Sequence, residues 1–124
     1  MEEPNRIGLS STATAQIDDL LEDLNSDKGE VELLKRDLYR LAVALGVKNH
    51  VEPPPLEDKS GWKDRVGEFD PEGVLYAAVE TAGLVEEGRS IYEFIECLAE
   101  YGIKNFYLAY QKTGQLPIED YFEE

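Results

Sequence analysis

Apolar residues recur at helical spacing in several separate stretches, and this periodicity constrains the fold more than any other feature of the sequence. The clearest stripes are Ile17, Leu20, Leu21 and Leu24, followed by Val31, Leu34, Leu38, Leu41, Ala42 and Leu45. Spacings of three and four residues place such side chains on one face of a helix, where they can be buried together. The sequence therefore predicts a mainly α-helical chain built from amphipathic helices.

Residues that begin and end helices stand at the edges of these stretches. The predicted starts are Ser10 and Ser11, then Asp70 with Pro71 for a helix reaching Gly83, then the capping box of Ser90 and Glu93. The similar sequences GVKN and GIKN begin at Gly46 and Gly102, and we expect each glycine to end a helix in the left-handed conformation. A further helix would follow Gly102 and end before Gly114. We interpret the similarity as the same helix-ending sequence used twice, not as an internal duplication.

The length and composition predict a compact single domain. A chain of 124 residues that is 42% hydrophobic can bury one core but is too short for two. Its predicted parts are a helical pair over residues 1–46, a proline-rich connector over 47–69, further helices over 70–114 and an acidic, aromatic tail over 115–124. We expect about five helices, with room for one short strand at residues 6–9, and Trp62 packed across the connector.

The charge restricts the classes of partner. A formal net charge of −15 opposes binding to free nucleic acid or to an anionic membrane, because both require clustered lysine and arginine. A basic protein surface would suit this charge. The acidic residues of the first helix are interpreted as a solvated face, since no histidine or glycine-bearing loop accompanies them to complete a metal site.

Several absences indicate a non-enzymatic protein of a reducing compartment. The single cysteine, Cys97, can form no internal disulfide, so we expect a cytoplasmic location, and without a basic neighbour it is expected to be inert. No apolar run is long enough to span a bilayer. The sequence has no glycine-rich phosphate loop, zinc-type cysteine pairs or nucleophile motif. We therefore expect no catalytic residue, cofactor or metal, and we interpret His50 as a surface loop residue.

Aromatic residues near the C-terminus are the candidates for binding a partner. Tyr107 and Tyr110 continue a helical stripe, whereas Tyr121 and Phe122 belong to the tail. Tyrosine is frequent at interfaces, but packing against the core explains the same stripe equally well. Both interpretations stay open, as does a homodimer.

The first 46 residues resemble a ribbon-helix-helix module, in which paired strands contact the DNA major groove. The resemblance lies in the strand-like RIGLS, the capped helix that follows it and the second helix reaching Gly46. It implies, as the alternative function, a DNA-binding transcriptional regulator or antitoxin. The DNA contacts would then be Arg6, Lys35, Arg36 and Arg40.

A second resemblance spans roughly residues 31–114. The segments LAVALGVKN, the proline-rich loop with Trp62, VLYAAVETAG and FIECLAEYGIKNFYLAY together resemble a family of small proteins associated with DNA phosphorothioation loci. These systems place sulfur in the DNA backbone and restrict unmodified DNA. The resemblance implies an accessory or adaptor protein that binds a larger protein of the same system, and it supplies no active residues. The family tends to carry basic residues where this chain has His50, Val51 and Glu52, which argues against direct DNA contact.

Overall fold

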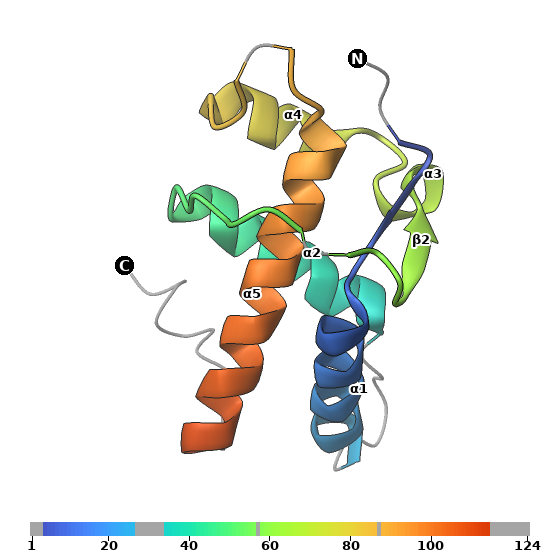
Figure 1. Ribbon diagram of the computed structural model, residues 1–124, viewed down its shortest axis with the longest axis vertical. Coiled ribbons are helices and arrows are strands. Elements are labelled where there is room, and N and C mark those ends of the chain that lie inside the picture. Colours follow the sequence, from blue (N-terminus) through green and yellow to red (C-terminus); the bar gives the residue numbers. More distant parts are fainter. Residues whose placement is uncertain (1–3, 27–33, 57, 87, 115–124) are drawn as a thin grey trace.

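The computed structural model describes residues 4–26, 34–56, 58–86 and 88–114 (Figure 1). Its elements in chain order are β1 (Arg6–Gly8), α1 (Ser11–Ser26), α2 (Lys35–Lys48), β2 (Lys63–Arg65), α3 (Val66–Phe69), α4 (Val74–Ala82) and α5 (Ile91–Thr113). The mainly α-helical prediction is confirmed, and β1 lies where a short strand was allowed. Val31 and the tail residues Tyr121 and Phe122 fall outside the described residues.

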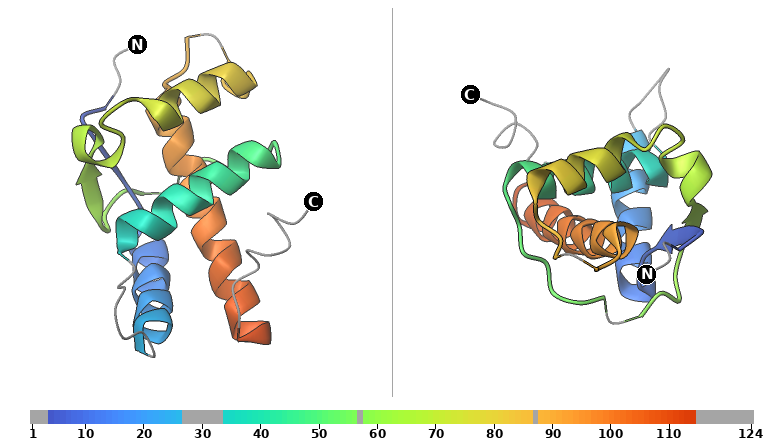
Figure 2. Two further views of the ribbon diagram at one scale, coloured as in Figure 1. Left: turned by 180° about the vertical axis from the view of Figure 1, so that it is seen from behind. Right: turned by 90° about the horizontal axis from the view of Figure 1, so that it is seen from above.

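The long helix α5 is the element around which the others pack. α2 crosses it near its middle, α1 lies beside its C-terminal half and α4 lies near its N-terminal end (Figures 1 and 2). Fully buried side chains from all of these elements meet in one core, and the largest of them are Tyr39, Phe69, Ile7, Leu9, Ile17, Leu20, Ile95, Leu98, Ile103, Val43 and Val79. Where their side chains are described, the stripes read from the sequence therefore do face a common interior, except at Leu34, which is exposed.

Two glycines allow α2 and α5 to cross at close range. A Cβ atom on Gly102 would lie 2.7 Å from Ala42 Cβ and 3.1 Å from Ala42 Cα, and one on Gly46 would lie 2.8 Å from Leu98 Cδ2. Both glycines are helical, since α2 continues to Lys48 and α5 continues to Thr113. The prediction that Gly46 and Gly102 end helices is therefore wrong. The two predicted helices on either side of Gly102 are one.

α2 ends at Lys48, two residues beyond Gly46, and its capping motif extends to Val51. His50 has a φ of 51°, its amide donates to the Val47 carbonyl at 3.2 Å, and the Val51 amide donates to the Gly46 carbonyl at 3.0 Å. These two bonds form a Schellman motif with His50 at the left-handed position, which glycine usually occupies. The exposed His50 is thus a helix-capping residue.

The proline-rich connector contains more regular structure than predicted. β2 pairs antiparallel with β1 in the register Arg6 to Arg65, Ile7 to Asp64 and Gly8 to Lys63. A short helix, α3, follows β2 directly and begins at Val66. Trp62 is half-buried and lies 5.6 Å from the Tyr39 ring, so it does anchor the connector on the core.

The predicted helix starts are confirmed at both serines and corrected at Asp70. Ser10 Oγ accepts from the Ala13 amide at 3.1 Å, and Ser90 Oγ accepts from the Glu93 amide at 3.1 Å. α4 begins at Val74, not at Pro71, because Gly73 takes a left-handed conformation immediately before it. The buried Asp70 still accepts from two amides at the start of α4, those of Leu75 and Tyr76, at 3.1 and 3.0 Å.

We predict that Gly102→Ala lowers the free energy of unfolding by about 1–3 kcal/mol, measured by urea denaturation, because the new methyl group would overpack against the backbone of α2. Gly67→Ala is the matched control, since nothing lies within 4 Å of the methyl group it would add. A Gly102→Ala protein as stable as the wild type or more stable would contradict the close crossing, since only the higher helix propensity of alanine would then be felt.

We predict that His50→Gly raises the free energy of unfolding by up to about 1 kcal/mol, because a residue with a side chain adopts the left-handed conformation at a cost that glycine avoids. Replacing the neighbouring exposed Lys48 by glycine, within the regular helix, should lower stability by about the same amount. A His50→Gly protein less stable than the wild type would show that the imidazole itself stabilises the end of α2.

Candidate functional site

Two buried glutamates of α5 accept hydrogen bonds from backbone amides of β1 and the residues after it, on the side that does not face β2. Glu96 Oε2 accepts from the Gly8 amide at 3.0 Å, and Glu100 Oε1 accepts from the Ser10 amide at 3.0 Å. The carboxylates are one helical turn apart, and the two amides are two residues apart on the strand, so their spacings match. Glu100 also accepts from the Ser10 hydroxyl at 2.5 Å. The carboxylates therefore supply the hydrogen-bond acceptors that the carbonyl groups of a third strand would supply.

Each buried carboxylate also has a lysine partner. Lys59 Nζ lies 2.6 Å from Glu96 and donates to the Arg6 carbonyl at 2.8 Å, while Lys104 Nζ lies 3.0 Å from Glu100. Burial raises the pKa of Glu96 above its ordinary value, although Lys59 and the Gly8 amide oppose this shift. All of these partners belong to the fold, so the pair of glutamates is a structural device. No group of three potential metal ligands comes together within the described residues.

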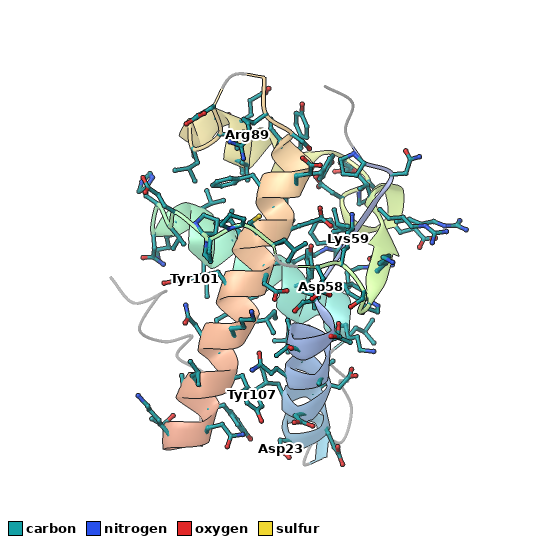
Figure 3. All side chains as sticks on the ribbon, viewed as in Figure 1. Asp23, Asp58, Lys59, Arg89, Tyr101 and Tyr107 are labelled. Carbon is teal, nitrogen blue, oxygen red and sulfur yellow. The ribbon has the colours of Figure 1, made fainter. Side chains whose placement is uncertain are left out.

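A cleft lies between the proline-rich connector and the N-terminal half of α5. Its volume is about 490 Å³, and Pro53, Leu56 and Lys59 face Phe94 and Cys97 across it. Lys59 and Arg89, which Figure 3 labels, line the same cleft, so the expectation that no basic residue lies near Cys97 is wrong. Burial nevertheless raises the pKa of the Cys97 thiol, against the smaller opposite effect of Arg89. The neutral thiol is therefore favoured there.

Three of the four predicted DNA contacts are engaged within the chain. Lys35 forms an ion pair with Asp18 at 3.0 Å, and Arg36 forms two hydrogen bonds with Asp64, at 2.6 and 2.9 Å. Arg40 donates to the Phe69 carbonyl at 2.7 Å. Only Arg6 of the four is exposed without an ion-pair partner in the described part of the chain. β1 pairs with β2 of its own chain, whereas the ribbon-helix-helix arrangement needs two paired copies of the N-terminal strand.

The predicted partner-binding tyrosines pack largely against the core. Tyr107 and Tyr110 are half-buried, and Figure 3 shows Tyr107 between α5 and α1. The exposed large residues on α5 are instead Tyr101 at 38% and Leu108 at 57%. The structure thus favours the core interpretation of Tyr107 and Tyr110, and the sequence reasoning overlooked Leu108.

An exposed and mainly apolar surface lies between α2 and the start of α4. We name it the α2–α4 groove. It has a volume of about 520 Å³ and is lined by Leu41, Ala44, Phe69, Pro71, Val74 and Leu75, with Asp37, Arg40, Asp70 and Glu72 around them. Val74 is 62% exposed in it, and Leu34, on the same face of α2, is 55% exposed. Two of the most exposed large apolar side chains among the described residues therefore lie in or beside this groove.

α4 itself is more apolar than its position on the surface requires. In its sequence, VLYAAVETA, the only polar residues are Glu80 and Thr81, yet Val79 is its only buried residue. A helix that is apolar on most of its circumference is normally covered on most sides. Here α2 and α5 cover one side only. The composition of residues 74–82 already carries this signal in the sequence.

Comparisons with known family models, with curated proteins and with solved structures each find no match to this chain. Within the described residues, no helix combines the length and the apolar character needed to cross a bilayer. The α2–α4 groove is therefore identified from its own geometry and composition.

We predict that the stability advantage of the wild type over Glu96→Gln declines as the pH rises from about 4 to 8, in thermal or urea unfolding. A raised pKa means that the folded chain binds the Glu96 proton more tightly than the unfolded chain does, so the unfolding free energy falls with pH across the shifted range. Glutamine removes this titration. Glu80→Gln, at an exposed position on α4, controls for the loss of a charge. An advantage that grows with pH would show that Lys59 outweighs burial.

Proposed function

We propose that this protein is a non-enzymatic adaptor that binds a larger protein through the α2–α4 groove. The observation that carries the proposal is the exposure of apolar side chains on α4, where Val74, Ala77 and Ala78 are exposed and Val79 is the buried residue. Exposed apolar patches of this kind mark protein interaction sites, since burying a side chain such as Val74 gains about 1.5–3 kcal/mol.

The polar groups inside the fold support a binding role over a catalytic one. Glu96, Glu100, Asp64 and Asp70 are buried, and each is hydrogen-bonded to groups of its own chain. A general acid or base must instead present its carboxyl group to a substrate. These four carboxylates stabilise the strand pair and the start of α4.

The shape and charge of the groove indicate an amphipathic helix as the partner segment. α2 forms one side of it, and Phe69, the loop 70–72 and the start of α4 form the other. Apolar grooves beside helices receive the apolar face of another helix in a common recognition mode. Asp37 and Glu72 lie at its edge, and the chain as a whole carries a formal charge of −15. A partner helix with lysine or arginine flanking its apolar face would complement both features.

The cellular setting that we propose is a phosphorothioation-linked DNA-modification or restriction system in the cytoplasm. This setting rests on the resemblance of residues 31–114 to proteins associated with such loci, and the engagement of Lys35, Arg36 and Arg40 within the chain supports a protein partner over DNA. The larger partner would then be one of the modification or restriction enzymes.

We predict that Val74→Asp abolishes co-purification of the partner from the native host, because a carboxylate would then be buried unpaired in the interface. Leu108→Asp is the matched control, since it places the same charge on a similarly exposed apolar residue of α5. Affinity purification followed by mass spectrometry would identify the bound proteins. Far-ultraviolet circular dichroism would confirm that both variants are folded.

Other outcomes separate the parts of this proposal. Loss of the partner with Leu108→Asp alone would move the docking surface to the C-terminal half of α5. A wild-type dimer that Val74→Asp converts to a monomer, measured by light scattering, would make a second copy the occupant. A partner that is no modification or restriction enzyme would reject the cellular setting while leaving the adaptor role intact.

A further inference from the structure

The strand pair presents three cations on its outward face, although the chain is strongly acidic. Arg6, Lys63 and Arg65 are exposed, whereas Ile7 and Asp64 between them are buried. This alternation follows from the two-residue period of a strand. We name the set formed by Arg6, Lys63 and Arg65 the cationic ribbon face.

Two of these cations are held directly opposite each other. Arg6 faces Arg65 in the register of the strand pair. The hydrogen bonds from the Val66 amide to the Asn5 carbonyl and from the Leu9 amide to the Trp62 carbonyl, both 3.0 Å, fix the alternation of the ladder. The Arg6 and Arg65 pair is therefore a non-hydrogen-bonded one, where opposite side chains approach most closely. Like charges in this position destabilise a sheet.

The chain leaves this repulsion without compensation. In the part of the structure that is described, none of the three cations has an ion-pair partner, whereas Lys35, Arg36, Lys59 and Lys104 each have one. Glu68 lines the same hollow as Arg6 and Arg65, but it lies 3.5 Å from Arg36. No acidic residue in the described ranges forms an ion pair at these positions, although the chain is rich in acids. A negatively charged partner would remove the repulsion.

We propose that the cationic ribbon face binds an acidic segment of a protein in an extended conformation. Lys63 and Arg65 are two residues apart on one strand, so their side chains are spaced by about 6.6 Å. An extended segment with acidic residues at alternate positions repeats with the same spacing and would pair with both. Arg6, opposite Arg65, lets the two guanidinium groups hold one carboxylate together, in charge-assisted hydrogen bonds.

The small size of the face favours carboxylates over a nucleic-acid backbone. Three cations would release few counterions from DNA, so the affinity gained would be small. A duplex would also extend past the face onto a surface that is mostly acidic, beginning with Glu68. A short peptide covers less of this acidic surface than a duplex does. The face lies on β1 and β2, apart from the α2–α4 groove, so this inference stands independently of the proposed function (Figure 1).

The test is fluorescence anisotropy with a labelled oligoglutamate peptide, at about 0.1 M salt, where charges more than about 10 Å apart are screened. The variant is Arg6→Gln with Arg65→Gln. The matched control is Arg89→Gln with Lys112→Gln, which changes the net charge equally at two other exposed positions. We expect the ribbon variant to bind the peptide about tenfold more weakly and the control to bind it as the wild type does.

Thermal unfolding is the second measurement. The ribbon variant should unfold at the same temperature as the wild type or a higher one, because the repulsion between Arg6 and Arg65 is gone. If it does not fold, Arg65→Gln alone should still weaken peptide binding severalfold. Wild-type protein that does not bind the peptide, or equal weakening in the control, would overturn the proposal. Binding of a labelled DNA duplex or single strand, lost in the ribbon variant without any peptide binding, would overturn it in favour of nucleic acid.

Discussion

The close crossing of α2 and α5 is the interaction on which the rest of the structure depends. Gly46 and Gly102 remove the side chains that would hold the two helices apart, so Ala42 and Leu98 meet glycine backbone instead. Because Gly102 continues the helix, α5 spans 23 residues without a break. This continuous helix contacts α4 near one end, crosses α2 in its middle and packs against α1 toward the other end. A break at Gly102 would separate α1 from the part of the core that holds α4.

The same continuity explains how a two-stranded sheet persists in a helical protein. An isolated pair of three-residue strands is marginal in water, and β1 has a second side whose amides need acceptors. Glu96 and Glu100 supply those acceptors from α5, and Lys59 and Lys104 balance their charges. Burying carboxylates is costly unless they are paired and hydrogen-bonded, and here both conditions hold. Two of the many acidic residues thus stabilise the fold and do not belong to the solvated surface.

Periodicity and capping residues predicted the helices well, because both act over a few neighbouring residues. The glycines were misjudged because a glycine suits a helix end and a close helix crossing equally. The distinguishing signal is phase: Ile95, Leu98, Ile103 and Phe106 keep helical spacing across Gly102, which a helix end would not preserve. β2 could not be predicted from Lys63, Asp64 and Arg65, since no apolar alternation marks it. Its pairing depends on β1, more than 50 residues away in the sequence.

The candidate surfaces were harder to predict than the fold. A surface can bind a partner only if packing leaves it exposed, so the packing must be known first. Lys35, Arg36 and Arg40 looked available until their partners Asp18, Asp64 and the Phe69 carbonyl were placed beside them. Tyr107 and Tyr110 looked equally available until they were found against the core. Conversely, α4 has the composition of a buried helix and is a candidate docking surface only because α2 and α5 leave part of it uncovered. Likewise, Lys63 and Arg65 form the cationic ribbon face only because the fold places Arg6 across from them. The candidates for binding a partner are therefore the residues that the fold leaves unpaired or uncovered. They are not the residues with the most reactive side chains.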